Sequence, residues 1–216
     1  MKDLAIYGAG GLGREVACLI GRINEAANEP MWNLVGFFDD GKPAGTAVSH
    51  FGKVLGGIDE LNAWHSPLSI AVAIGKPQTV KAIVDKISND NINFPNLVDP
   101  TFSIADTRTF SVGKGNIIQA NCWVSCDVAI GDFNLLNGYI NLGHDITIGD
   151  FNAIMPSVCI SGKVSIGSLN LFAVSSAVLQ QVKIGTGVTL SPGSILLSRP
   201  KDNSTYIGNP ATLFRY

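Results

Sequence analysis

Ile130-Gly-Asp-Phe-Asn134 and Ile148-Gly-Asp-Phe-Asn152 are the same five residues, repeated 18 positions apart. The same spacing adds three related segments, which are Val112-Gly-Lys-Gly-Asn116, Ile166-Gly-Ser-Leu-Asn170 and Ile184-Gly-Thr-Gly-Val188. Self-similarity at a fixed period indicates a repeat architecture, in which each copy buries its apolar face against its neighbours. The stretch from about 112 to 196 therefore decides the fold of this part of the chain.

A shorter period lies inside the longer one. Every sixth residue is apolar, and all but Phe172 are aliphatic: Val112, Ile118, Val124, Ile130, Leu136, Leu142, Ile148, Ile154, Ile160, Ile166, Phe172, Val178, Ile184, Leu190 and Leu196. Three such hexads form one coil of a triangular prism, with the apolar side chains pointing inward. The glycine that follows the aliphatic residue and the asparagine three residues later both tolerate positive φ, so we place them at the corners.

This pattern predicts a hexapeptide-repeat parallel β-helix, although the residues alone do not determine its hand. The alternative is an antiparallel all-β domain with strands of similar spacing. That fold requires period-2 alternation and hairpin turns. The single Asn-Gly pair, Asn137-Gly138, lies inside the hexad register, which favours the β-helix.

The N-terminal segment follows a different pattern. A short apolar strand, Leu4–Tyr7, is followed by Gly8-Ala-Gly10-Gly11-Leu-Gly13 and a helix-like stretch, Arg14–Arg22. The spacing of these glycines fits the dinucleotide fingerprint, and a helix that begins at such a turn presents backbone N–H groups to a phosphate. We therefore expect Gly8, Gly10 and Gly11 to lie near phosphates, although turn glycines with no ligand would look the same.

Two further strands are predicted in this segment. Leu34–Phe38 ends at the acidic pair Asp39-Asp40, and Ser69–Ile74 leads to Lys76 and a helix from Pro77 to Lys86. This βαβ order predicts a small parallel sheet over residues 1–100, whose ligand lies at the carboxyl ends of the strands. Asp39 and Asp40 are candidates for binding a ribose or base and Lys76 for an anion, whereas the alternatives are solvated acids and an ordinary helix-start lysine. Because about 100 residues are few for a full dinucleotide fold, a nucleotide-linked substrate is favoured over NAD.

Composition excludes several classes of protein. The 15 Lys and Arg and 17 Asp and Glu give a formal charge of −2, which provides no basic field for nucleic acid or an anionic membrane. No run of about 18 apolar residues predicts a membrane span, and nothing resembles a signal peptide, so we expect a cytoplasmic protein. The four cysteines, Cys18, Cys122, Cys126 and Cys159, form no CxxC pair; we expect buried free thiols and no metal site.

Four motifs occur in a fixed order, which are Ile6-Tyr-Gly-Ala-Gly-Gly-Leu-Gly-Arg-Glu-Val16, Gly36-Phe-Phe-Asp-Asp40, Gly143-His144-Asp145 and Ile207-Gly-Asn-Pro-Ala211. In this order they resemble the sugar acetyltransferase family that includes the bacillosamine-pathway and perosamine N-acetyltransferases and the sialic acid O-acetyltransferases. The resemblance implies a Rossmann-like domain over 1–100 that binds a nucleotide-linked sugar. It further implies a left-handed β-helix over 101–216, with a C-terminal loop, that binds acetyl-CoA between subunits of a homotrimer.

The chemistry of acetyl transfer requires a base. His144 is the only histidine within the repeats, its position projects outward from the prism, and imidazole accepts protons near neutral pH. Asp145 follows at once and is expected to orient the imidazole, as an acid does in a hydrolase triad. Because adjacent residues on a strand point to opposite faces, this pairing requires a bend, which we place at Gly143. The resemblance places Asn137 near the sugar; the alternative role for Asn137 is a corner residue.

The resemblance also suggests where acetyl-CoA lies. Small residues on the coils after His144 are candidates for backbone contacts with pantetheine, namely Gly162, Ala173 and Ser191, and the loop containing Gly208 and Pro210 corresponds to the adenine end. Two positions depart from the family pattern: Leu12 stands where members commonly have histidine in the glycine turn, and Ala153 replaces a second histidine nine residues after the catalytic one.

The function that these features predict is N-acetylation of a nucleotide-linked amino sugar by acetyl-CoA, with His144 as general base. O-acetylation of a sugar hydroxyl is an alternative within the family, since either acceptor needs a base. A non-catalytic binding or assembly module is an alternative from another class. A hexapeptide-repeat carbonic anhydrase would require three histidines for zinc, and the repeats hold one.

Overall fold

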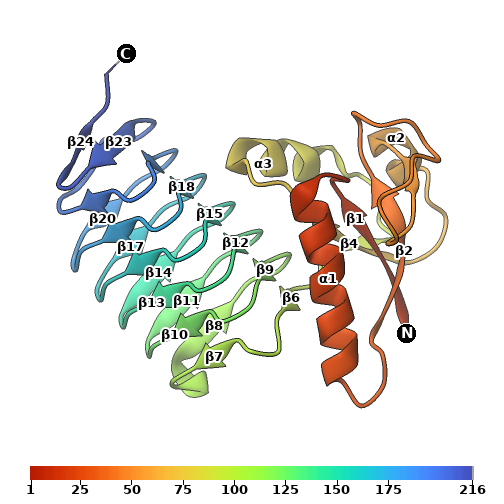
Figure 1. Cartoon of the computed structure of the whole chain (residues 1–216), viewed down its shortest axis with the longest axis horizontal. Helices are drawn as coiled ribbons and strands as arrows, with labels where there is room; N and C mark the ends of the chain where they lie inside the picture. The colour runs from red at the N-terminus through yellow and green to blue at the C-terminus, as the bar shows by residue number, and fades with distance from the viewer. Residues whose placement is uncertain (216) are drawn as a thin grey trace. The chain divides into compact units, whose positions relative to one another are not determined.

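The computed structural model describes residues 1–215 and divides into two compact units, Met1–Pro100 and the part that begins at Thr101 (Figure 1). None of the helices within the described residues is long and apolar enough to cross a membrane.

The N-terminal unit is built on a five-stranded parallel sheet in the order β3-β2-β1-β4-β5. Its elements are β1 (Lys2–Tyr7), α1 (Gly11–Ala26), β2 (Trp32–Phe38), β3 (Val54–Gly56), α2 (Ile58–Asn62), β4 (Leu68–Val72), α3 (Pro77–Lys86), β5 (Ile92–Asn93) and β6 (Leu97–Val98). Strand β4 is buried along its whole length, as expected for a central strand covered on both faces. Helix α1 packs Val16, Leu19 and Ile20 inward, at the spacing of one helix face. The predicted parallel sheet is confirmed.

The second unit consists of three stacks of short strands. Within this unit the stacks run β22-β19-β16-β13-β10-β7, β20-β17-β14-β11-β8 and β24-β23-β21-β18-β15-β12-β9 (Figure 1). The strands are β7 (Ser103–Ile104), β8 (Phe110–Val112), β9 (Ile117–Ile118), β10 (Trp123–Val124), β11 (Val128–Ile130), β12 (Leu135–Leu136), β13 (Asn141–Leu142), β14 (Ile146–Ile148), β15 (Ala153–Ile154), β16 (Cys159–Ile160), β17 (Ser165–Ile166), β18 (Leu171–Phe172), β19 (Ala177–Val178), β20 (Lys183–Ile184), β21 (Thr189–Leu190), β22 (Ile195–Leu196), β23 (Thr205–Gly208) and β24 (Ala211–Leu213), with a 3-10 turn at Thr107–Thr109.

The register of these strands reproduces the repeat of the sequence. Each strand pairs in parallel with the strand of the next coil, so that a residue lies beside the one 18 positions further on, as Leu136 does with Ile154. The apolar residues at every sixth position are buried from Ile118 to Leu196, and only Val112, in the first coil, is partly exposed. The second unit is thus a three-sided parallel β-helix, as predicted.

The corners of the prism are made differently from the prediction. The left-handed conformation occurs at every sixth residue from Gly115 to Gly193, three positions after each inward apolar residue, and bulky side chains such as Phe133 and Tyr139 adopt it (φ 55° in both). The glycine next to the apolar residue has no positive φ. A Cβ on Gly149 would lie 2.8 Å from the carbonyl oxygen of Gly167 on the next coil. These glycines provide space between coils, so our assignment of positive φ to them was wrong.

The repeated asparagines also have another purpose than the predicted one. Asn116, Asn134, Asn152 and Asn170 are buried. In the first three, the Oδ1 atom accepts hydrogen bonds from the backbone N–H and the side-chain amide of the next asparagine, at 2.8–3.1 Å. The ladder ends where Val188 donates its N–H to Asn170. Buried amides require such partners, and these asparagines therefore hold successive coils together.

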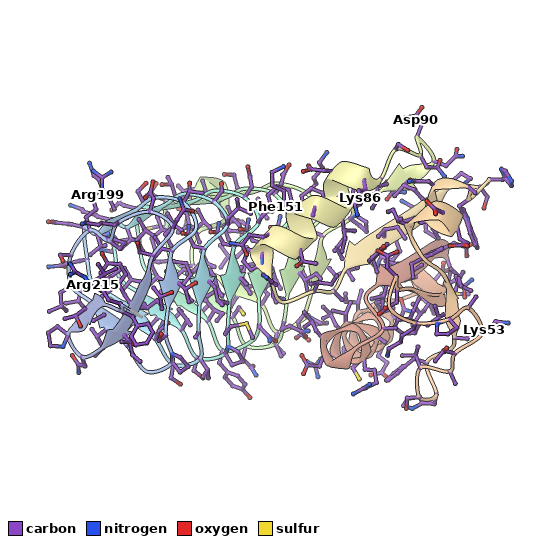
Figure 2. The ribbon with its side chains drawn as sticks, turned by 90° about the horizontal axis from the view of Figure 1, so that it is seen from above. Lys53, Lys86, Asp90, Phe151, Arg199 and Arg215 are labelled. Carbon is purple, nitrogen blue, oxygen red and sulfur yellow. The ribbon has the colours of Figure 1, made fainter. Side chains whose placement is uncertain are left out.

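Two further features complete the β-helix. The rings of Phe133 and Phe151 stack beside the ladder with centroids 5.2 Å apart, and Figure 2 labels Phe151 among the outer side chains of the coils. At the other end, the predicted C-terminal loop is the turn of an antiparallel hairpin, in which β23 pairs with β24.

Candidate active site

A cleft lies at the carboxyl ends of β1 and β4, where the strand order of the N-terminal sheet reverses. Parallel sheets bind their ligands at this point. The cleft has a volume of about 410 Å³ and is lined by Tyr7, Gly8, Gly10, Gly11, Leu12, Asp39, Asp40, Gly41, Ala73, Ile74, Thr79 and Ile83. Five predicted binding residues are therefore gathered here, together with Leu12, which replaces a family histidine.

Asp39 holds the glycine turn in place. Its carboxylate accepts hydrogen bonds from the N–H of Ala9 at 2.7 Å and from the N–H of Gly41 at 2.9 Å. The ammonium group of Lys42 donates to the carbonyl oxygen of Ala9 at 2.6 Å. Both carboxylate oxygens of Asp39 thus already have a partner, and the residue shapes the turn before any ligand binds.

Asp40 connects the other side of the cleft. It accepts hydrogen bonds from the Tyr7 hydroxyl at 2.7 Å and from the N–H of Ile58, at the start of α2, at 2.9 Å. Burial, together with the hydrogen bond to Asp40, raises the pKa of Tyr7 well above its ordinary value. We did not predict a role for Tyr7, because an aromatic residue that ends a buried strand is read as core.

Two helices begin at this cleft, α1 at Gly11 and α3 at Pro77. Neither N-terminus has a side-chain cap or an acidic residue in its first turn, so the positive end of each helix dipole favours an anion here. In α3 the N–H groups of Thr79 and Val80 already donate to the carbonyl oxygen of Lys76. Thr79, in the first turn of α3, lines the cleft. Lys76 is an exposed residue that precedes α3 and does not line the cleft.

In the β-helix, His144 and Asp145 form a pair on an outward corner. The distance from His144 Nδ1 to Asp145 Oδ2 is 2.6 Å, and the side chains are 54% and 50% exposed. The bend that the pairing requires lies at Asp145 itself, which has a φ of 56°, and not at Gly143 as we expected. The left-handed position of the hexad therefore turns the carboxylate back toward the imidazole.

The remaining predicted residues of the β-helix lie at two different corners. Gly162 follows His144 by one coil at the corner after β13 and β16, which we call the His144 corner. Asn137, Ala173 and Ser191 stack at the corner after β12, β18 and β21, which we call the Asn137 corner. One coil earlier in this stack is Gln119, whose buried Nε2 has no hydrogen-bond partner within the described residues.

The candidate acetyl-CoA contacts are only partly available. The N–H groups of Ala173 and Ser191 already donate to Leu190 and Tyr206 on the next coil. Their carbonyl oxygens accept hydrogen bonds from the N–H groups of Ser176 and Ser194, both at 3.2 Å. The second lone pairs of these oxygens and the Ser191 hydroxyl are therefore the groups left to face a ligand. Gly208 and Pro210 are exposed in the hairpin turn, which is held by a hydrogen bond from the Gly208 N–H to Ser194 Oγ at 3.0 Å.

The second family histidine has no counterpart at its position. Ala153, which stands there, is a buried residue of β15. The cysteines differ from our prediction: Cys122 is buried, but Cys18 and Cys159 are exposed. Within residues 1–215, no group of three or more His, Cys, Asp or Glu side chains is arranged to hold a metal ion.

One face of the β-helix exposes large apolar side chains. Trp123 lies on β10, and Tyr139, Val174, Leu179 and Leu197 lie on later coils, at the two corners that border this stack. Each of the five side chains is 40–66% exposed. Large apolar side chains that are exposed on one side of a β-helix favour contact with another molecule.

Comparisons with known proteins agree with this architecture. The family described as the PglD N-terminal domain matches residues 3–87. The acetyltransferase domain of PglB from Neisseria gonorrhoeae FA1090, solved in complex with acetyl coenzyme A, is 27% identical, with a TM-score of 0.86 over 99% of both chains. No curated protein matches the sequence.

A second solved structure shares the fold at lower identity. The perosamine N-acetyltransferase of Caulobacter crescentus, in complex with CoA and GDP-perosamine, is 21% identical, with a TM-score of 0.85 over 100% of this chain and 98% of its own. The predicted fold class, a Rossmann-like domain followed by a left-handed parallel β-helix, is confirmed. Residues 3–87 thus match the PglD N-terminal domain family, and the whole chain is similar in fold and sequence to a solved sugar acetyltransferase domain.

Proposed function

We propose that this protein is an acetyl-CoA-dependent N-acetyltransferase that acts on the amino group of a nucleotide-linked sugar. The observation that carries the proposal is the hydrogen-bonded pair of His144 and Asp145 on an outward corner of the β-helix. The likeness to a PglB acetyltransferase domain in complex with acetyl coenzyme A supports the choice of acyl donor.

The reaction follows from this pair. The sugar amine attacks the thioester carbonyl of acetyl-CoA, a C–N bond forms, and the C–S bond breaks to release CoA. His144 Nε2 accepts the proton that the amine loses. Asp145 accepts the Nδ1–H hydrogen bond, which keeps Nε2 unprotonated before the reaction and stabilises the imidazolium afterwards.

The cleft of the N-terminal unit is the proposed site of the nucleotide. The amides of Gly10 and Gly11 and the two helix N-termini would bind the diphosphate, since such groups favour anions. Gly8 would lie near the phosphates as part of the turn, because its own N–H donates to the carbonyl oxygen of Phe38. Asp39 and Asp40 would reach the ribose or base through their remaining lone pairs, and Lys76 would act from outside the cleft wall.

We further propose a homotrimer. The apolar face around Trp123 and Leu197 would be covered by neighbouring copies, which would bring the Asn137 corner of one copy to the His144 corner of another. Acetyl-CoA would then lie between copies, near Gly162, Ala173 and Ser191, with its adenine end near Gly208 and Pro210. Sedimentation velocity measures this directly, and a monomer at micromolar concentration would contradict it. The cytoplasmic location stays a prediction.

A thiol-release assay tests the activity. Acetyl-CoA is offered with UDP-, GDP- and dTDP-linked amino sugars, with the corresponding hydroxyl sugars and with the free sugars. Nucleotide-dependent CoA release with an amine acceptor supports the proposal. Release with hydroxyl sugars alone would identify an O-acetyltransferase. Release with free sugars alone would remove the role of the N-terminal cleft, and no release from any acceptor would favour the non-catalytic module.

A further inference from the structure

Gly162 lies directly beside the imidazole of His144. A Cβ built on Gly162 would come within 2.6 Å of Nε2, 2.7 Å of Cε1 and 2.9 Å of Cδ2. Real Cβ atoms do not approach other heavy atoms this closely, so a side chain at this position is incompatible with the observed ring. The two coils are tied together here, because the N–H of Lys163 donates to the carbonyl oxygen of His144 at 2.8 Å.

The three distances also define the direction of approach. A Cβ in the ring plane, beyond Nε2, would be clearly farther from Cε1 and Cδ2 than from Nε2. The near-equal values place it over the face of the ring. The imidazole therefore presents one face to Gly162, and the in-plane lone pair of Nε2 does not point at this residue.

From this geometry we propose that Gly162 is a positioning residue for His144. Two contacts fix the orientation of the imidazole. The hydrogen bond between Nδ1 and Asp145 determines which way the ring nitrogens point, and contact of one ring face with Gly162 determines the plane of the ring. This role differs from the backbone contact with pantetheine expected from the family resemblance. It rests on the proposed function only for its effect on turnover, since the ring geometry exists without substrate.

The geometry is tested first on the wild-type protein by NMR. Protons below an aromatic face are shifted upfield by the ring current. The Gly162 Hα resonances should therefore lie upfield and move downfield in His144→Ala. Resonances that do not move would overturn the proposed packing, whether or not the protein is an acetyltransferase.

The second test uses Gly162→Ala, with Gly167→Ala as the matched control. A Cβ on Gly167 would come equally close, 2.6 Å, to a backbone oxygen of the next coil, but at another corner. Gly167→Ala should lose more thermal stability than Gly162→Ala, because its Cβ meets a backbone oxygen, whereas the exposed His144 ring can move away from the new Cβ. Only Gly162→Ala should lose at least tenfold in kcat with an unchanged KM for acetyl-CoA, and only it should shift the His144 ring ¹⁵N resonances, which are assignable because the chain has three histidines.

The outcomes separate the possible roles. A raised KM for acetyl-CoA with unchanged kcat and ¹⁵N resonances would mean that Gly162 contacts the donor and would overturn the positioning role. Equal loss of kcat in both variants would reduce Gly162 to a spacer between coils. If the wild-type protein releases no CoA, the proposed function fails, and the Hα and ¹⁵N measurements still decide whether Gly162 orients the ring.

Discussion

The two units of this protein hold their functional groups in opposite ways. In the N-terminal unit, the cleft is formed by loops that are all different, and each is secured by its own contact, such as the Asp39 carboxylate on the glycine turn. In the β-helix every coil has the same backbone, and the candidate site arises at an outward position whose residue type changes from coil to coil. Residues 18 apart at the His144 corner are Cys126, His144, Gly162, Gln180 and Ser198.

The two units therefore differ in whether the same residues contribute to stability and to function. The β-helix is stabilised by ladders that pass from coil to coil, so an outward residue such as His144 is replaceable without loss of the core. In the N-terminal unit the same carboxylates hold the fold of the cleft and are proposed to face the nucleotide, so the two roles would be coupled.

The largest expected effect comes from His144→Ala. Loss of the general base should lower kcat by about 10²- to 10⁴-fold, while the thermal unfolding curve stays unchanged because the side chain is exposed. CoA release and circular dichroism measure the two. Full activity in this variant would eliminate His144 as the base.

Next is the ladder itself. Asn152→Ala removes the acceptor for the N–H and amide of Asn170 and the donor to the Gly167 carbonyl. Leaving these buried groups unsatisfied should lower the free energy of unfolding by about 3 kcal/mol. Urea unfolding measures it, with the exposed Asn141→Ala as the control. Equal stability of the two variants would show that the ladder is not what holds the coils.

In the cleft, Asp39→Asn should affect binding. The amide replaces one acceptor oxygen with a donor that faces an N–H group, so the glycine turn should loosen. We expect about tenfold weaker binding, equivalent to about 1.4 kcal/mol, of whichever nucleoside diphosphate binds the wild type. Calorimetry measures the Kd, and Asp85→Asn, at an exposed ion pair, serves as the control. An unchanged Kd would uncouple the two roles of Asp39.

Tyr7→Phe should have the smallest effect. It removes the hydrogen bond to Asp40 and should cost about 1 kcal/mol. Because the folded-state pKa of Tyr7 is raised, its contribution is present below the ordinary tyrosine pKa of about 10 and is lost as pH rises above that value. Urea unfolding between pH 8 and 10.5 should show a steeper alkaline loss in the wild type than in Tyr7→Phe. Parallel curves would argue against the role of this hydrogen bond.

Much of the fold could be predicted, because its signals are local. The hexad of apolar residues defines the coils, and the order of strands and helices before Pro100 defines the parallel sheet; the predicted helix from Pro77 to Lys86 matches α3 exactly in its bounds. The candidate cleft residues were also gathered as predicted, since the carboxyl ends of parallel strands share one edge. Lys76 does not line the cleft, because a residue that precedes a helix can point to either side of its N-terminus, and its contact with an anion stays a prediction.

What the sequence by itself determined is the periodicity, and with it the inward core and the outward position of His144. Only the tertiary structure decided how neighbouring coils meet. Residue 149 has to be a glycine because the next coil leaves no space for a Cβ, and residue 152 has to be an asparagine because it continues the buried ladder. The left-handed φ of Asp145 turns its carboxylate toward the imidazole. Each depends on an atom 18 residues away or on a backbone angle, and neither is encoded in the type of a single residue.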